Sequence, residues 1–352
     1  GLSVARPGGD EFALSKPGLD NDAGALALAR SIIDLVREPF AIGHHQIVAG
    51  CSVGIVLSPR DGATVAALLK NADLALYNAK SDGRGIARMF VGELERSACA
   101  RQALESDLNE AWNARQLSLA YQPIFEAGNG RLAGFEALAR WHHPVRGDVP
   151  AEAFISVAEE TGLILPIGGW VLEEACRAAT RWPSHLSISV NLSPIQFRGA
   201  HAFQQVRTAL ERSGLAPQRL ELEITESMLL QEGPGVRATL DRFRAEGIML
   251  TLDDFGTGYS SLRYLRMLHI GRLKVDRAFV EQIEGDPHNL AIVQAILGLA
   301  RALSLKSTAE GIETEGQLNL LKAEGCTHVQ GYLLGRPMSA DEALSLARGA
   351  AA

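Results

Sequence analysis

The pattern of apolar and polar positions changes near residue 116. From there on, short apolar runs of strand length alternate with longer stretches whose apolar residues recur every three to four positions, as in amphipathic helices. The expected strands are 117–125, 132–139, 186–192, 220–225, 249–253, 272–275, 306–309 and 327–330. The expected helices between them are 151–160, 169–181, 202–213, 236–246, 288–303 and 316–324. Eight strands alternating with helices predict a (β/α)8 barrel.

The connection between the first two expected strands is unusually short. Residues 126–131 read Glu-Ala-Gly-Asn-Gly-Arg, which is too few for a crossover helix and rich in turn residues. The first two strands should therefore form a hairpin. The fold class that follows is an α/β, TIM-like barrel with one antiparallel strand.

The first 90 residues indicate part of a smaller α/β domain. They contain an expected strand at 11–14, a helix at 22–37, a strand at 47–57 and an amphipathic helix at 65–80. From 91 to about 115 the pattern is helical and charged, with no proline and no glycine after Gly92. Such a segment suits a stiff helical connector. We expect a partial α/β domain at 1–90, a connector at 91–101 and the barrel at 102–352.

Composition narrows the function classes. The chain has 34 Lys and Arg against 41 Asp and Glu, a net charge of −7, which weighs against binding to a nucleic acid polymer or a membrane surface. Its four cysteines are scattered without a CxxC pair, so neither a zinc site nor a disulfide framework is indicated. We find no apolar run of about 18 residues and no signal peptide. These features predict a cytoplasmic location.

Polar or charged residues stand at the ends of seven of the eight expected barrel strands. In a barrel the carboxyl ends of the strands converge on one face, where active sites are built. We therefore expect a dense, oxygen-rich cluster there. Its candidates are Glu136, Arg140, Asn191, Glu223, Glu226, Asp253, Asp254, Lys274, Asp276, Glu310, Glu313 and Gln330.

Each candidate alone has a simpler interpretation. Asp253 and Asp254 can cap a following helix, Lys274 can form a salt bridge with Asp276 or another barrel carboxylate, and Asn191 can hydrogen-bond within a turn. Two adjacent carboxylates closing an apolar strand nevertheless repel each other unless a cation lies between them. It is the convergence of all these groups that favours a site.

The donor types select the metal. Every candidate ligand is an oxygen donor, and no His or Cys stands at a strand end, which favours Mg²⁺, Mn²⁺ or Ca²⁺ over Zn²⁺. Two such cations sharing a carboxylate can clamp the attacking and leaving oxygens of a displacement at phosphorus and lower the pKa of a bridging water. The residues thus predict a metal-dependent phosphoester hydrolase and leave its substrate open.

A series of motifs runs in order through residues 102–347. One of them is Glu136-Ala137-Leu138-Ala139-Arg140-Trp141. The others lie at 121–124, 189–193, 223–226, 253–262, 274–277, 309–314 and 330–332. Together they resemble the EAL family of cyclic di-GMP phosphodiesterases, with the first motif as the family signature. The resemblance implies hydrolysis of cyclic di-GMP to linear pGpG with two Mg²⁺ or Mn²⁺ ions per barrel.

The resemblance also implies a role for each matching residue. Glu136, Asn191, Glu223 and Asp253 would hold the first metal, and Asp253, Asp254 and Glu310 the second. Lys274 would orient the attacking water, and Glu313 would support the site. The substrate contacts would be Gln122, Leu138, Arg140, Asp276 and Gln330, with the planar fork of Arg140 suited to phosphate. Glu226 would brace the loop 253–259, which in this family links the site to a homodimer surface.

The N-terminal part contains Gly8-Gly9-Asp10-Glu11-Phe12, in which the glycines let backbone amides approach a nucleotide phosphate and the two acids could hold Mg²⁺. This segment resembles the signature of a GGDEF (diguanylate cyclase) domain, and the N-terminal part resembles the second half of that domain. The family's first strand and its metal-binding Asp would lie before Gly1, Pro7 replaces the usual residue before the glycines, and Leu2 stands where the product-inhibition motif has Asp. We expect no cyclase activity from this chain. The remnant would bind GTP or regulate the barrel through the connector.

Two other functions remain open at this stage. One is a catalytically silent receptor for cyclic di-GMP, and the other is a bifunctional cyclase and phosphodiesterase in a longer protein. The complete set of expected metal ligands and Lys274 favours the phosphodiesterase over the receptor.

Overall fold

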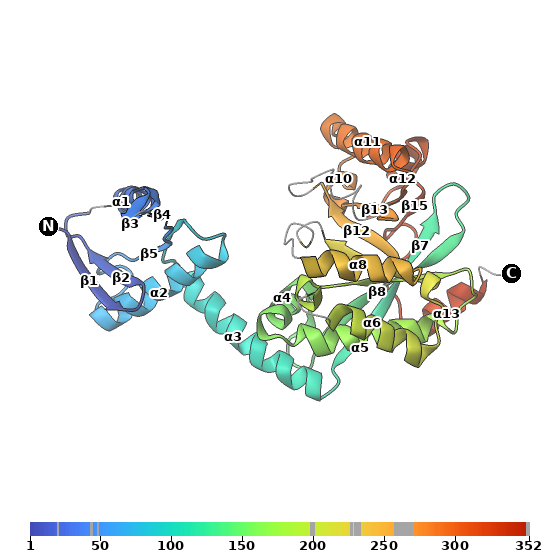
Figure 1. The fold of residues 1–352 in the computed structure, drawn as a ribbon, viewed down its shortest axis with the longest axis horizontal. Coiled ribbons are helices and arrows are strands. Elements are labelled where there is room, and N and C mark those ends of the chain that lie inside the picture. Colours follow the sequence, from blue (N-terminus) through green and yellow to red (C-terminus); the bar gives the residue numbers. More distant parts are fainter. Residues whose placement is uncertain are drawn as a thin grey trace. The chain divides into compact units, whose positions relative to one another are not determined.

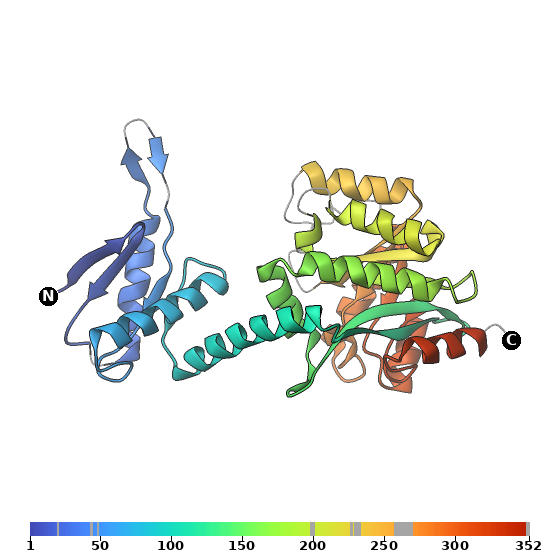
Figure 2. The same ribbon diagram turned by 90° about the horizontal axis from the view of Figure 1, so that it is seen from below.

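The computed structural model describes residues 1–19, 21–42, 45–47, 49–197, 201–225, 228, 234–256 and 270–349. The chain divides into two compact units, Gly1–Leu104 and Glu105–Ala352. Figures 1 and 2 show the elements of each unit. None of the helices within these described ranges is both long enough and apolar enough to cross a membrane.

The first unit is built from short strands and two main helices. The hairpin β1 (Ser3–Gly8) and β2 (Glu11–Ser15) is antiparallel, as is the pair β3 (Phe40–Ile42) and β4 (His45–Ile47). Strand β5 (Val53–Ile55) pairs in parallel with β6 (Ala87–Met89). The helices are α1 (Asp22–Arg37) and α2 (Val65–Ser81).

One expected element in this unit is wrong. The β-branched run 47–57 predicts a single strand, but the structure has β4 ending at Ile47 and β5 beginning at Val53. The two strands pair with different partners, β3 and β6, so they cannot be one straight element. Gly50 lies between them, and a glycine gives no packing support to a strand.

Local chemistry explains where the two helices begin and how they pack. The Asn21 side chain accepts a hydrogen bond from the Gly24 amide at 2.8 Å, and Thr64 caps α2 in the same way through Ala67. Helix α2 approaches β5 very closely, because a Cβ atom on Gly54 would lie 2.2 Å from the Ala72 carbonyl oxygen. The small core of this unit forms where these elements meet.

The second unit is the predicted barrel. Helix α3 (Gly92–Asn113) leads into it. Its strands are β7 (Leu117–Glu126), β8 (Leu132–His143), β10 (Ser187–Asn191), β11 (Leu220–Thr225), β12 (Met249–Phe255), β13 (Arg272–Val275), β14 (Lys306–Ala309) and β15 (His328–Val329). The main helices are α4 (Ala151–Thr161), α5 (Ile164–Ala179), α6 (His201–Ser213), α8 (Pro234–Ala245), α11 (Pro287–Ala302), α12 (Glu315–Ala323) and α13 (Ala340–Gly349), and the short α10 spans Arg277–Val280.

The strand order confirms the expected topology. Strands β10 to β15 lie in sequence order as parallel neighbours, β15 pairs with β7, and the sheet closes through β8 pairing in parallel with β10. Strand β7 is antiparallel to both of its neighbours, so the hairpin expected at 126–131 is present. A short extra strand, β9 (Gly147–Val149), pairs with the end of β8.

Successive side chains along each barrel strand point alternately outward, toward the helices, and inward, toward the barrel axis. Leu222, Ile224, Leu250 and Leu252 are all buried and point away from the barrel axis, toward the helices. The alternate residues point inward, because Lys274 of β13 contacts both Glu223 of β11 and Asp253 of β12. The helices therefore pack on an apolar outer face of the sheet, and its interior is available for polar chemistry.

Candidate active site

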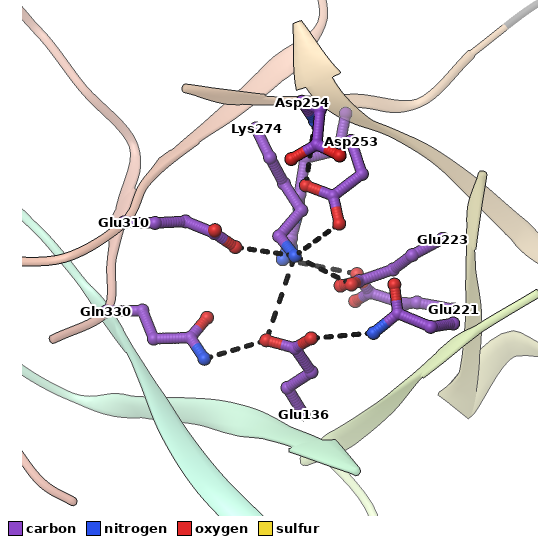
Figure 3. Close-up of polar contacts among 10 residues, drawn as sticks. Glu136, Glu221, Glu223, Asp253, Asp254, Lys274, Glu310 and Gln330 are labelled. Atoms are coloured by element: carbon purple, nitrogen blue, oxygen red, sulfur yellow. Dashed lines mark hydrogen bonds and ion pairs between the residues drawn. The ribbon is translucent and has the colours of Figure 1, made fainter. Parts of the chain in front are cut away.

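A single ammonium group lies at the centre of the inward-facing acids. Lys274 Nζ is 2.7 Å from Glu223 Oε2, 3.2 Å from Asp253 Oδ2, 2.5 Å from Glu310 Oε1 and 3.7 Å from Glu136 Oε2. The lysine side chain is only 2% exposed. Figure 3 shows these four carboxylates pointing at the nitrogen from different sides.

The closed sheet explains how residues so distant in sequence meet. The five charged residues lie on, or directly after, five mutually parallel strands. They are Glu136 on β8, Glu223 on β11, Asp253 on β12, Lys274 on β13 and Glu310 after β14. Parallel strands bring their carboxyl ends to the same edge of the barrel. The convergence predicted from the strand ends is therefore observed.

Two amide side chains orient Glu136. Asn191 Nδ2 donates to Glu136 Oε1 at 2.8 Å, and Gln330 Nε2 donates to Glu136 Oε2 at 2.8 Å. Burial by itself would raise the pKa of Glu136, but Lys274 and the two amides outweigh it and lower that pKa below its ordinary value. Glu136 is therefore held as an anion in a fixed orientation.

Other acids in the cluster are less easily ionised. Burial, reinforced by Glu136, raises the pKa of Glu223 well above its ordinary value. Burial raises the pKa of Glu310 to about 8 despite the opposing effect of Lys274. Burial and the adjacent Asp253 raise the pKa of Asp254 to about 6. One lysine does not neutralise this many carboxylates, so the cluster favours additional positive charge.

The same neighbours act on the lysine in the opposite direction. Burial alone would lower the pKa of Lys274, but Asp253, Glu136, Glu223 and Glu310 together raise it well above its ordinary value. Lys274 is therefore a permanent cation. This geometry corresponds to the salt-bridge interpretation of Lys274, with barrel carboxylates rather than Asp276 as its partners.

The donor set fits hard divalent cations. Within the described ranges, no three acidic, His or Cys side chains stand around a common metal position, because the carboxylates turn toward Lys274 Nζ instead. All six expected ligands nevertheless lie at one edge of the barrel: Glu136, Asn191, Glu223, Asp253, Asp254 and Glu310. The buried Gln330 Oε1 beside them has no hydrogen-bond partner in the part of the chain that the structure describes, so it is available as an acceptor there. Oxygen donors with surplus negative charge suit Mg²⁺ or Mn²⁺.

The Asp253-Asp254 turn has an unusual backbone. Asp254 has a φ of +54°, a conformation rare for residues other than glycine, and its amide donates to Asp253 Oδ1 at 3.0 Å. The two adjacent carboxyl groups are thereby both placed at the end of β12. Glu226 and residues 257–262 of the expected motif lie outside the described residues.

A cleft of about 560 Å³ opens above the acidic cluster. Its wall includes Glu136, Glu310 and Glu313 together with four of the five expected substrate contacts, Gln122, Leu138, Arg140 and Gln330. The fifth, Asp276, does not line the cleft and instead caps α10, where its Oδ1 accepts from the Ala278 amide at 2.8 Å.

Several cleft residues are not singled out by the sequence, among them Glu152, Arg277 and Tyr332. Glu152 lies in the first turn of α4, Arg277 begins α10, and Tyr332 follows β15. Tyr332 is half exposed, and the guanidinium of Arg336 lies 4.4 Å from its ring centre. All three follow the carboxyl end of a strand by a few residues. Charged and aromatic residues in the loops just after the strand ends could therefore have been predicted to line the cleft.

The acidic pair of the first unit has a different setting. Gly9 has a φ of +54° at the turn between β1 and β2, and the Arg6 guanidinium donates to its carbonyl oxygen at 2.5 Å and 3.0 Å. Gly8, Asp10 and Glu11 at the tip of this hairpin are exposed to solvent. Gly8 and Gly9 thus lie at the turn of a hairpin, and the two acids that follow them face water.

The fold and the site define a class of protein: an α/β barrel whose strand ends build a buried, oxygen-rich centre under a cleft. The family comparisons make this more specific. Residues 105–337 match the EAL domain model, and residues 2–85 match the diguanylate cyclase, GGDEF domain model. The chain therefore belongs to the EAL domain family, with a GGDEF sequence before the barrel.

Relatives carry the same two-domain sequence. The chain is 43% identical over 347 residues to the bifunctional diguanylate cyclase/cyclic di-GMP phosphodiesterase MucR of Pseudomonas aeruginosa. It is 36% identical over 340 residues to the cyclic di-GMP phosphodiesterase PdeR of Escherichia coli. These alignments cover 97% and 96% of this chain but 50% and 51% of the relatives. The chain thus spans about half the length of the curated relatives it matches.

Solved structures agree on the barrel. The PaMucR phosphodiesterase in its c-di-GMP complex superposes with a TM-score of 0.66 at 46% identity, covering 68% of this chain and 99% of that one. BlrP1 of Klebsiella pneumoniae, in a manganese and cyclic di-GMP complex, superposes with a TM-score of 0.56 at 29% identity, covering 63% and 56% of the two chains.

Proposed function

We propose that the barrel hydrolyses cyclic di-GMP to linear pGpG with two divalent cations, Mg²⁺ or Mn²⁺. The observation that carries this proposal is the enclosure of Lys274 Nζ by four carboxylates from different strands, at the base of a cleft. The names of the relatives support the substrate, since MucR and PdeR are phosphodiesterases of this nucleotide. BlrP1 in complex with manganese and cyclic di-GMP supports the cofactor class.

The reaction adds water across one phosphodiester bond. A bond forms between the water oxygen and phosphorus, the bond to the leaving ester oxygen breaks, and that oxygen leaves as a hydroxyl group. When bound by the carboxylates and Asn191, the divalent cations would supply positive charge and an acidified water. Lys274 Nζ would donate a hydrogen bond that orients the attacking water and would offset the negative charge that develops at phosphorus.

Cleft residues would hold the dinucleotide. Arg140 would bind phosphate through the parallel donors of its guanidinium. Leu138 would contact the nucleotide from the same strand, β8, and Gln122 from the neighbouring β7. Glu313 lines the cleft, and its backbone amide donates to Gln317 Oε1 at 2.8 Å, which ties this position to the start of α12. Glu313 and Gln330 would therefore support the site from two adjacent loops.

The direct test is incubation of the chain with cyclic di-GMP and Mn²⁺, following pGpG by chromatography. We expect turnover that EDTA abolishes and that Glu136→Ala and Lys274→Ala each reduce by a factor on the order of 1,000. Glu126→Ala is the matched control, because Glu126 ends β7, the strand that runs opposite to its neighbours. Binding of the nucleotide without cleavage by the unchanged chain would favour a silent receptor instead.

We also propose that residues 1–90 act as a regulatory module, joined by a connector at 91–101 to a catalytic domain at 102–352, and that the barrel forms a homodimer. Addition of GTP should change the rate of pGpG formation at least by a factor of about 2, a small allosteric coupling. Equal rates with and without GTP would contradict regulation by GTP. Sedimentation analysis of the chain tests the dimer separately.

A further inference from the structure

A second ion pair lies beneath the one at the active centre. Arg272 Nη1 is 3.1 Å from Glu221 Oε2, and both residues are 3% exposed. They come from β13 and β11, the strands that carry Lys274 and Glu223, whose own ion pair measures 2.7 Å. We call Glu223–Lys274 the upper pair and Glu221–Arg272 the lower pair.

The spacing along the strands places the pairs one above the other. Glu221 precedes Glu223 by two residues, and Arg272 precedes Lys274 by two, so each shares a face with its counterpart. Figure 3 shows Glu221 next to Glu223 on the same strand. The barrel therefore holds two acids and two cations in matching order. Two residues along a strand span about 7 Å, so an unpaired charge in the lower pair would lie near the upper one.

The layer around the lower pair is polar as well. Ser189, Thr251 and Thr308 are at most 1% exposed, and none of their hydroxyl groups has a hydrogen-bond partner among the residues that the structure describes. Arg272 Nε and Glu221 Oε2 also lack one among these described residues. Barrel layers of this kind are usually filled by branched apolar side chains. A buried ion pair in such a place adds little stability over an apolar replacement, so its presence calls for another explanation.

We propose that Arg272 and Glu221 are positioning residues for the active centre, each preventing the other from disturbing the upper pair. Arg272 keeps the Glu221 carboxylate from drawing Lys274 Nζ downward, away from the attacking water. Glu221 keeps the Arg272 guanidinium from capturing Glu223, an expected metal ligand. This inference rests on the function proposed above for Lys274 and the carboxylates.

The choice of cations fits this arrangement. Arginine stays protonated under all ordinary conditions, so the lower pair does not dissociate by losing a proton. Lysine is a compact charge on a flexible stem, which is suitable for contacting a water but is easily displaced by a competing anion. Charges a few ångströms apart in a low-dielectric interior interact strongly, so an uncompensated Glu221 would compete effectively for Lys274.

The two single variants should fail in different ways. Arg272→Met leaves Glu221 without its partner, and we expect kcat to fall about 100-fold while the Mn²⁺ affinity is unchanged or tighter, because negative charge is added. Glu221→Met leaves the guanidinium without its partner, and we expect Mn²⁺ to bind about tenfold more weakly, because Glu223 is diverted. A purely structural role would give the two variants the same defects.

The double variant Glu221→Met/Arg272→Met removes both charges and is the decisive measurement. We expect its kcat and Mn²⁺ affinity to return to within about fivefold of the unchanged chain, a strong non-additivity between contacting residues. Thr251→Val is the matched control, since it alters the same buried layer without removing a charge. It should change neither quantity by more than about threefold.

The experiment uses the whole 352-residue chain, with calorimetry of Mn²⁺ binding, rates of pGpG formation and metal-free crystal structures. In metal-free Arg272→Met, Lys274 Nζ should lie closer to Glu221 than to Glu310. Full kcat in Arg272→Met, or a double variant as impaired as that single variant, would overturn the inference. If Arg272→Met does not fold, Glu221→Met and the double variant decide it. A failure of the unchanged chain to bind Mn²⁺ or cleave the nucleotide would count against the proposed function, whereas the position of Lys274 in the metal-free crystals still tests the inference.

Discussion

Each unit of the chain carries two adjacent acids, and their surroundings differ completely. Asp10 and Glu11 lie at the exposed tip of a two-stranded hairpin that is closed by Arg6. Asp253 and Asp254 end a buried strand of a closed sheet, where Asp253 lies 3.2 Å from Lys274 Nζ. Adjacent acids therefore become a chemical centre only when the sheet around them brings other charges to the same point.

Burial explains why the acids of the barrel, unlike those of the hairpin, have raised pKa values that favour binding of a cation. In the barrel, burial and neighbouring acids raise the pKa of Asp254 to about 6 and that of Glu310 to about 8. An acid held in this way is ready to exchange its proton for a cation. The hairpin acids, surrounded by water, gain nothing comparable from binding a metal.

Of the substitutions that test this difference between the two units, replacing Lys274 should have the largest effect on activity and stability. Lys274→Met leaves Glu136, Glu223, Asp253 and Glu310 without their shared cation, so the rate of pGpG formation should fall by a factor on the order of 1,000. The metal-free protein should also lose stability, since breaking a buried ion pair costs about 3–5 kcal/mol. Rate measurements and thermal unfolding in EDTA check both effects.

The control for Lys274→Met is Lys322→Met in the exposed last turn of α12, which should leave rate and melting temperature unchanged. Mn²⁺ should raise the melting temperature of Lys274→Met more than that of the unchanged chain, because the unpaired acids bind it without competition from the ammonium. Equal shifts would show that Lys274 does not hold these acids together.

Much of the barrel and its centre could be predicted because both depend on local patterns that repeat. The apolar run 220–225 predicts a strand with the bounds that the structure gives, and Glu223 belongs to the polar residues predicted to converge at the strand ends. Parallel strands then require that such ends meet, whatever the details of the loops. Glu136, Asp253 and Lys274 were found in this way.

Other features depend on contacts that no local pattern encodes. The break between β4 and β5 reflects different partner strands, and the place of Asp276 at the start of α10 reflects a cap rather than a cleft contact. The pairing of Glu221 with Arg272 joins two strands with a third between them, so only the closed barrel reveals it.

Replacing Arg277, a residue of the cleft, should have the next largest effect, and that effect should be on KM. Arg277 is exposed at the start of α10 and lines the cleft near Glu310, outside the carboxylate cluster. Arg277→Met should raise KM about tenfold and change kcat little, as expected for uniform binding of an anionic substrate. Steady-state kinetics check this split, and Arg212→Met on the exposed surface of α6 is the control. A fall in kcat with constant KM would instead place Arg277 in the chemical step.

A smaller effect should appear when pH is varied without metal. The pKa of Glu310 is raised from 4.5 to about 8 and that of Asp254 from 3.8 to about 6, so the folded protein holds protons that the unfolded chain releases. Their stabilising contribution is complete below the unfolded values and is lost as the pH rises through the folded ones. Buried His328 acts in the opposite direction up to about pH 6.5, because burial lowers its pKa to about 3. The melting temperature in EDTA should therefore fall by about 5 °C between about pH 6.5 and pH 8.5.

Two neighbours do not disturb that pH window. Because the pKa of Glu136 is lowered, its contribution to the stability of the folded protein is lost only in acid. Because the pKa of Lys274 is raised, its contribution is lost only in strong base. Glu310→Gln removes the larger of the two raised pKa values of Glu310 and Asp254 and should flatten the curve, while excess Mn²⁺ should reverse its direction because cations bind the ionised acids. A melting temperature that rises with pH in EDTA would contradict the raised values.

The smallest effect should come from the hairpin. Asp10→Ala and Glu11→Ala, alone or together, should leave the melting temperature unchanged, as for most exposed substitutions. They should leave the metal-dependent rate of pGpG formation within about twofold of that of the unchanged chain. The reason is that both side chains face water at the tip of β1 and β2, where no burial favours a bound cation. Calorimetry with Mn²⁺ gives the sharper measurement, because the number of tightly bound ions should stay the same in the double variant. The loss of one ion would show that an exposed acidic pair can form a metal site without a closed sheet around it.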